Sequence, residues 1–303
     1  MANNLQIRQV PKKRLSVNDA LTNSIFSMGA EEFKTFKDCD ECKFLEGKKK
    51  QGNIFSSYWL KMLEDSHVDI SRPLEEFDRS ILDACISAQN VGNEAITVRS
   101  IWKFITGNPD AKITDGLRAE ILNRIDKLAV IRLKVDITDA VKAGFYNTDR
   151  TCTITSKILP CDIMTTEVNG QIVDDVIIFR GNSLILELAN LRRGKKKQSA
   201  QILTYDNKLF NVPNQRNTLT TTAIKSYIVR RVKIAKAHDN ISRTILFETL
   251  LKRCGLSDAD KRKKQEIRKT TESVMRHLVT EDEIKSFNFA KTGNAITKIN
   301  FQF

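Results

Sequence analysis

The sequence predicts an α+β protein in which two units of the same design follow one another. Helical stretches with apolar residues at spacings of three and four alternate with short β-type segments. One order of elements, a helix, a short strand, two helices and a hairpin, occurs twice. Charge also divides the chain, because residues 191–303 hold 25 Lys+Arg and 10 Asp+Glu, whereas residues 1–190 hold 25 and 27.

Residues 1–53 are expected to form an N-terminal arm that is partly disordered, with at most one helix. The arm contains the motif Cys39-Asp-Glu-Cys42. A structural zinc site needs four ligands, usually from a second pair at similar spacing. The sequence has no such second pair, so we predict ordinary thiols, no metal site and no cofactor.

Residues 54–190 are predicted to form the first unit, with a β-rich extension at its end. The predicted elements are a helix opened by Pro73 and ended by Gly92, a short strand at 96–98, a helix ended by Gly107, a helix that starts after Thr114, and strands at 130–137 and within 151–188. Within the extension, Asn169-Gly170 and Gly181-Asn182 are hairpin signals, and Leu184–Leu188 is predicted as a strand.

Residues 191–217 are predicted to be a basic linker, and residues 218–303 the second unit. The predicted elements of this unit are a helix at 219–237, a short strand at 244–246, a helix that ends at Gly255, a helix at 259–280, and strands at 284–289 and 295–303. This order is that of the winged helix, a helix-turn-helix followed by a β-wing. The fold prediction is therefore two tandem winged-helix domains, with the β-rich extension on the first.

The helix at 259–280 is the best candidate for a DNA reader. Its apolar stripe, Ile267, Val274 and Leu278 with Thr271, must face the core. The opposite face offers side chains that pair with base edges or phosphates. The predicted DNA-binding residues are Arg262, Gln265, Lys269 and Arg276 on that face, Lys261, Lys263, Lys264 and Arg268 beside it, Lys291 in the wing, and Arg192, Arg193, Lys195, Lys196 and Lys197 in the linker.

The equivalent helix of the first unit is different. Its outward residues are Ala119, Asn123 and Asp126, which offer little to a phosphate backbone. We therefore expect the first unit to be a weaker reader or to serve protein–protein contact.

Several classes of protein are disfavoured. The sequence has no G-x-x-x-x-G-K-[ST] loop, no His-x-His motif with a downstream tyrosine, no tyrosine after Tyr227 and no two-metal acidic cluster, so we predict no catalytic residues and no enzyme. No apolar stretch approaches the length of a membrane span, and the polar N-terminus does not resemble a secretory signal. We expect a cytoplasmic protein without a membrane partner.

The sequence resembles the iteron-binding, theta-type plasmid replication initiators, which are built from two tandem winged helices. The likeness covers roughly residues 70–303 and is clearest in Tyr227-x-x-x-Arg231, the basic helix from Lys261, and the closing segments Ile284-Lys285-Ser286-Phe287 and Lys291-Thr292-Gly293. The resemblance implies binding to direct repeats in double-stranded DNA, a homodimer through the first winged helix, and recruitment of host replication proteins. A winged-helix transcriptional regulator and a DNA-processing enzyme with an unrecognised site remain alternatives.

Overall fold

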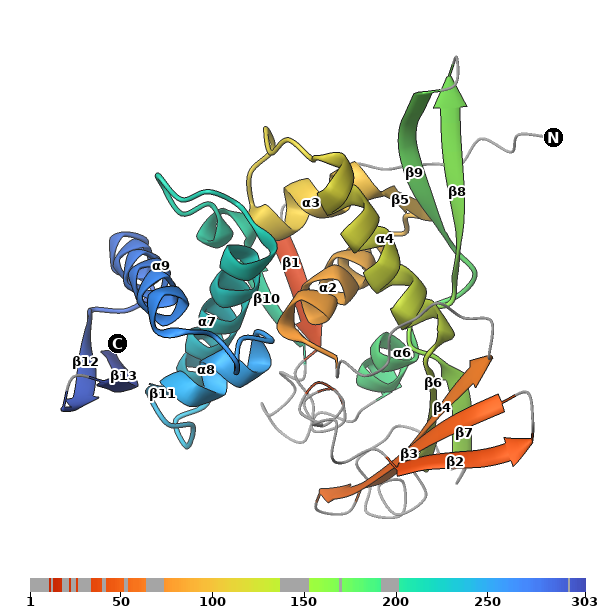
Figure 1. Ribbon diagram of the computed structural model, residues 1–303, viewed down its shortest axis with the longest axis horizontal. Helices are drawn as coiled ribbons and strands as arrows, with labels where there is room; N and C mark the ends of the chain where they lie inside the picture. Colours follow the sequence, from red (N-terminus) through yellow and green to blue (C-terminus); the bar gives the residue numbers. More distant parts are fainter. Residues whose placement is uncertain are drawn as a thin grey trace.

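The computed structural model of the chain has a mixed α+β architecture of helices and small antiparallel sheets (Figure 1). It describes residues 13–17, 34–39, 42–51, 54–63, 74–136, 153–168, 171–191, 202–293 and 295–303, together with Pro11, Thr22 and Phe26. Buried apolar side chains from both halves of the chain form one continuous core. Among the described helices, none combines the length and the apolar character needed to cross a membrane.

The first half contains the predicted helices at nearly the predicted positions. Its elements are α2 (Glu76–Asn90), β5 (Ala95–Thr97), α3 (Val98–Thr106), α4 (Asp115–Val130), β8 (Cys161–Val168) and β9 (Gln171–Phe179). Local signals explain the bounds. The Thr114 side chain accepts a hydrogen bond from the Leu117 amide at the start of α4, and Gly107 ends α3 in the left-handed conformation.

The second half repeats this order. Its elements are α7 (Leu219–Ala237), β11 (Thr244–Leu246), α8 (Phe247–Arg253), α9 (Lys261–Thr280), β12 (Ser286–Thr292) and β13 (Ala295–Gln302). The sheets correspond as well, because the strand orders are β5-β9-β8 in the first half and β11-β13-β12 in the second. In each half the short strand pairs with the second strand of the hairpin.

Two expectations for the β-rich extension have different outcomes. The hairpin signal Asn169-Gly170 is confirmed, since β8 and β9 pair up to Val168 and Gln171 on either side of it. The predicted strand Leu184–Leu188 is wrong, because Leu184–Leu191 is a helix, α6. A short apolar run has no period that separates a buried strand from a buried helix, and leucine and alanine are good helix formers.

A five-stranded sheet takes up part of the arm that was expected to be loose before residue 54, because two of its strands lie between Lys34 and Gln51. It consists of β2 (Lys34–Cys39), β3 (Cys42–Gln51), β4 (Ile54–Leu63), β6 (Arg132–Asp136) and β7 (Thr153–Lys157), in the order β2-β3-β4-β6-β7. Cys39 and Cys42 lie opposite each other where β2 turns into β3. The C-x-x-C motif therefore marks the end of a hairpin. The strands β2, β3 and β4 were not predicted, although each pairs with its neighbour in the chain, whereas β6 and β7 lie within the strands predicted at 130–137 and 151–188.

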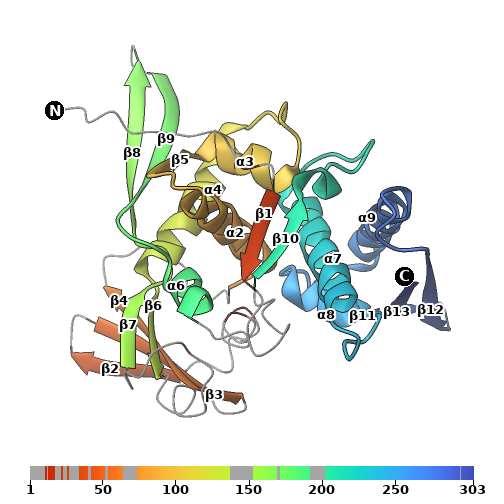
Figure 2. The ribbon, with the colours of Figure 1, turned by 180° about the vertical axis from the view of Figure 1, so that it is seen from behind.

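A two-stranded ribbon joins the halves. β1 (Lys13–Val17) pairs antiparallel with β10 (Ile202–Asp206) and lies between α2 and α7 in both views (Figures 1 and 2). Residues 202–217, predicted as the end of a basic linker, are instead folded: β10 leads into the 3₁₀ helix η2 (Asn207–Phe210), and Phe210 is fully buried.

Arg14 of β1 lies at the centre of this seam and is 1% exposed. Its guanidinium stacks 3.8 Å from the ring centroid of Phe210, and its Nη1 donates to Ser226 Oγ at 3.2 Å. The aromatic face and the hydroxyl allow the cation of Arg14 to be buried. This part of the predicted arm therefore belongs to the core.

Candidate nucleic-acid interface

The helix α9 places the predicted core stripe inward, as expected. Asp260 caps its N-terminus by accepting a hydrogen bond from the Lys263 amide at 2.6 Å. Ile267, Thr271, Val274 and Leu278 are all buried, so the helical period read from the sequence is confirmed. Met275 and His277 are buried too, which widens the contact between α9 and the rest of the second half.

The opposite face of α9 is open to solvent. Exposed positions include all four residues of the predicted reading row and two of the flanking lysines, namely Arg262, Gln265, Lys269, Arg276, Lys261 and Lys264. The two remaining flanking residues, Lys263 and Arg268, are half-buried. The structure therefore brings the predicted side chains of α9 together on one surface.

Carboxylates of the same helix form ion pairs with some of the cations on this face. Arg276 pairs with Glu272 at 2.7 Å, and Glu266 lies 3.3 Å from Lys263 and 3.8 Å from Arg262. Exposed pairs at this spacing contribute only about 0–1 kcal/mol, so a phosphate can displace the carboxylate at little cost. Within the described part of the chain, Lys261, Lys264 and Lys269 form no ion pair.

The β12–β13 hairpin lies at the same end of the molecule as α9 (Figures 1 and 2). Lys291 is exposed beside the turn at Gly293, where φ is +59°. Lys285, just before β12, and Lys298 of β13 are exposed as well and were not predicted. The alternation of the strands could have revealed Lys298, because Ile299 beside it is buried.

The outer face of this small sheet is polar. Thr244 Oγ1 donates to Asn300 Oδ1, and Asn300 Nδ2 donates to Asn288 Oδ1, both at 3.0 Å. On the other face Phe287 and Phe289 pack edge to face with centroids 5.7 Å apart, and Phe301 is buried. The aromatic face anchors the hairpin and leaves the lysines and amides outward.

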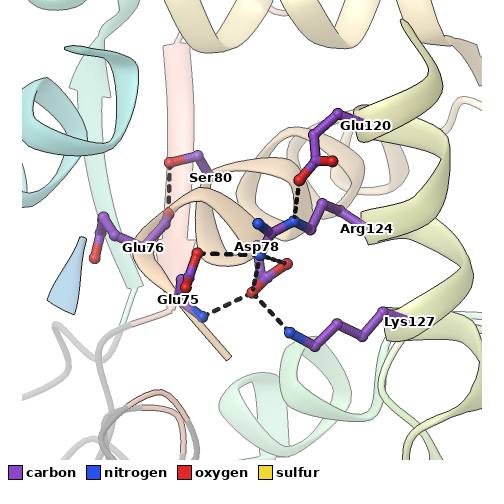
Figure 3. Close-up of polar contacts among 7 residues, drawn as sticks. All are labelled: Glu75, Glu76, Asp78, Ser80, Glu120, Arg124 and Lys127. Carbon is purple, nitrogen blue, oxygen red and sulfur yellow. Dashed lines mark hydrogen bonds and ion pairs between the residues drawn. The ribbon is translucent and has the colours of Figure 1, made fainter. Parts of the chain in front are cut away.

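The corresponding helix of the first half keeps its cations inside the molecule. On α4, Arg124 Nε pairs with Glu120 at 2.8 Å, and its Nη1 lies 3.1 Å from Glu75 and 3.2 Å from Asp78 (Figure 3). Lys127 Nζ lies 3.4 Å from the same Asp78. Burial opposes the charge of Arg124, but these carboxylates hold its pKa above the ordinary value.

The outward face of α4 is correspondingly poor in positive charge. Arg118 donates to Asp175 of β9 at 2.8 Å, which ties α4 to its hairpin. Ala119, Asn123 and Asp126 are exposed, as the sequence indicates. The two halves share a topology, but the outward face of α9 is rich in positive charge and the outward face of α4 is not.

The remaining candidates give no further site. Arg192, Arg193, Lys195, Lys196 and Lys197 lie outside the described residues. Burial raises the pKa of the thiols of Cys85, Cys161 and Cys254. In the described ranges, no group of His, Cys, Asp and Glu is arranged to hold a metal ion.

No protein-family model matches the sequence, and comparisons with curated proteins and with solved structures find no similar chain.

Proposed function

We propose that this chain binds double-stranded DNA in a sequence-specific manner through α9 and the β12–β13 hairpin, and that it initiates replication of a plasmid or other mobile element. The observation that carries the proposal is the outward face of α9, where lysines without ion-pair partners in the described part surround the uncharged Gln265. A localised basic surface is the electrostatic footprint of nucleic-acid binding.

In this proposal each half is a winged helix. The order α7, β11, α8, α9 and β12–β13, with β11 paired to β13, is the connectivity of a helix-turn-helix with a wing. The third helix of such a domain enters the major groove, and the wing contacts the flanking backbone. α9 supplies Gln265 for an adenine edge and Arg262 for a guanine edge, whereas Lys264, Lys291 and Lys298 meet phosphates.

The first half has a different role in this proposal. Its cations bind the carboxylates of Glu75, Asp78, Glu120 and Asp175, so α4 has few left for DNA. One reading domain joined to one assembly domain suits a protein that places several copies on repeated sites. The resemblance to two-winged-helix plasmid initiators supports replication as the purpose of that assembly.

Salt dependence tests whether binding is electrostatic. If about six phosphates are neutralised, affinity for duplex DNA falls by about 10³-fold between roughly 50 and 200 mM salt. Fluorescence anisotropy of the full chain with labelled duplexes measures this. Absence of binding to random and native flanking DNA at the lower salt concentration would overturn the proposal.

Two substitutions separate reading from phosphate contact. Gln265→Ala relaxes the preference at one base pair, by about 1–3 kcal/mol, and leaves the salt slope unchanged. Lys264→Ala weakens binding to all sequences and lowers the slope by about one unit. The matched control is Asn123→Ala on α4, which is also exposed and changes neither quantity. If all three variants behave alike, α9 is not the reader.

A footprint on DNA flanking the gene distinguishes an initiator from a regulator. Protection of several direct repeats supports the initiator. Protection of a single palindromic site assigns the chain to transcriptional control, and cleavage of the DNA in the presence of divalent metal assigns it to a processing enzyme.

A further inference from the structure

The segment at 207–217, which joins β10 to α7, is attached to one flank of α9. Gln215 Nε2 donates a hydrogen bond to the backbone carbonyl of Thr270 at 3.4 Å. Farther along the helix, His277 Nε2 lies 3.4 Å from the backbone carbonyl of Lys208. Because the two contacts on α9 are seven residues apart, the segment follows the helix over roughly two turns.

These contacts place the segment next to the outward face of α9. An α-helix turns by about 100° per residue, so Thr270 and His277 lie about 80° and 60° around the helix axis from Arg262. Arg262 belongs to the exposed row that we assign to DNA, whereas Thr271, on the far side, is buried. The segment therefore lies along the edge between the outward face and the core.

Hydrogen bonds fix the end of the segment that leads into α7. The backbone carbonyl of Arg216 accepts a hydrogen bond from Thr221 Oγ1 at 2.8 Å, and Asn217 Oδ1 accepts one from Lys225 Nζ at 2.8 Å. Thr218 then caps the helix. The backbone of Arg216 thus has a defined position beside α9.

The charge of the segment is positive. Residues 207–217 contain two basic side chains, Lys208 and Arg216, and no carboxylate. Lys208 Nζ pairs with Glu281 at 2.9 Å. Arg216 is exposed, and within the described ranges it forms no ion pair. Its guanidinium is therefore available to an anion outside the chain.

The dimensions of the major groove indicate which anion this is. With its side chains an α-helix is about 10–12 Å across, and the major groove of B-DNA is about 12 Å wide. A helix in the groove therefore lies between two phosphate backbones, and a segment on its flank meets one of them. A guanidinium group binds phosphate through paired hydrogen bonds.

The β12–β13 hairpin serves the other flank. In Figures 1 and 2 the hairpin and the teal segment just before α7 lie on opposite sides of α9. We propose that Arg216 binds a DNA phosphate on the side of the groove opposite the hairpin, so that α9 is held between two backbone contacts. This inference rests on the proposed binding of DNA through α9 and adds a contact on a separate segment.

Fluorescence anisotropy of the full chain with labelled duplex DNA, over a range of salt concentrations, tests the proposal. Arg216→Ala weakens binding to all duplexes alike, lowers the salt slope by about one unit and leaves the base preference unchanged. An unchanged slope in a variant that still binds DNA overturns the contact at Arg216 and leaves binding through α9 intact. Absence of DNA binding by the unchanged chain overturns both.

A second variant tests whether the position of the segment matters. Gln215→Ala keeps every charge but removes the side-chain hydrogen bond to Thr270, so it weakens DNA binding by less than Arg216→Ala does. Affinity equal to that of the unchanged chain overturns the role of the attachment to α9. Circular dichroism verifies that both variants fold.

The matched control removes a positive charge elsewhere. Lys112 is exposed between α3 and α4 in the first half, and Lys112→Ala leaves the salt slope unchanged. If this control lowers the slope as much as Arg216→Ala, the effect is one of general charge, and Arg216 does not bind a particular phosphate.

Discussion

The ion pair between Glu76 of α2 and Arg230 of α7 offers a quantitative test of how the halves are held together. Only 2% of the Glu76 side chain and 7% of the Arg230 side chain are exposed. Burial lowers the pKa of Arg230, but Glu76, Tyr205 and Asp83 together raise it by more, so the net pKa lies above its ordinary value. Removing one partner from a buried pair typically costs about 3–5 kcal/mol of stability.

The surroundings predict which substitution costs more. Arg14 and Arg79 lie close enough to feel the positive charge of Arg230. Arg230→Met leaves Glu76 buried, but Arg14 and Arg79 still compensate it and lose a repulsive neighbour, so the cost is at the lower end, about 3 kcal/mol. Glu76→Gln leaves three arginines with one fewer carboxylate, so the cost is at the upper end, about 5 kcal/mol.

Urea denaturation followed by far-UV circular dichroism measures these free energies of unfolding. The double variant Glu76→Gln/Arg230→Met loses less than the sum of the two single variants, because neither charge is left alone. Equal costs for the single variants, or a double variant equal to their sum, would refute the argument from cluster charge.

Three further results are expected. Burial raises the pKa of Asp83 from 3.8 to about 6, so its contribution to stability is full below about pH 4 and is lost as the pH rises to about 6. The free energy of unfolding of Asp83→Asn therefore falls less across this pH range than that of the unchanged chain. A pH profile that is the same for both proteins contradicts the shift. Gly107→Ala lowers stability by more than about 1 kcal/mol, because φ is +66° and an added Cβ collides with the backbone carbonyl of Asn207. The control Gly116→Ala on α4 is neutral or mildly stabilising in thermal melts, because its Cβ meets nothing within 4 Å. Val274→Asp unfolds the second half, because it buries a charge on the fully buried face of α9, and a native circular dichroism spectrum for this variant would contradict the packing.

Local signals made much of the fold predictable. A single residue marks one end of each of four helices. These residues are the caps Thr114, Thr218 and Asp260, which start α4, α7 and α9, and the left-handed Gly107, which ends α3. The face of α9 was equally predictable, because a helix repeats every 3.6 residues whatever its surroundings.

Non-local pairing was not predictable. β1 and β10 are far apart in the chain, and neither short segment carries a sign of its partner. The buried charge cluster around Glu76 and Arg230 was missed for the same reason, because Arg14, Glu76 and Arg230 belong to three elements and have no diagnostic spacing. α6 was misread because its apolar run fits a buried strand and a buried helix equally well.

The ribbon of β1 and β10 constrains the order of events during synthesis. Val17 pairs with Ile202, so the strand that leaves the ribosome first waits for a partner about 185 residues behind it. At about 5–20 residues per second, that delay is about 10–40 s. During this interval the aromatic ring of Phe210 is not yet available to Arg14. A nascent chain interrupted before residue 202 therefore displays an unpaired strand edge, which is a substrate for chaperones and proteases.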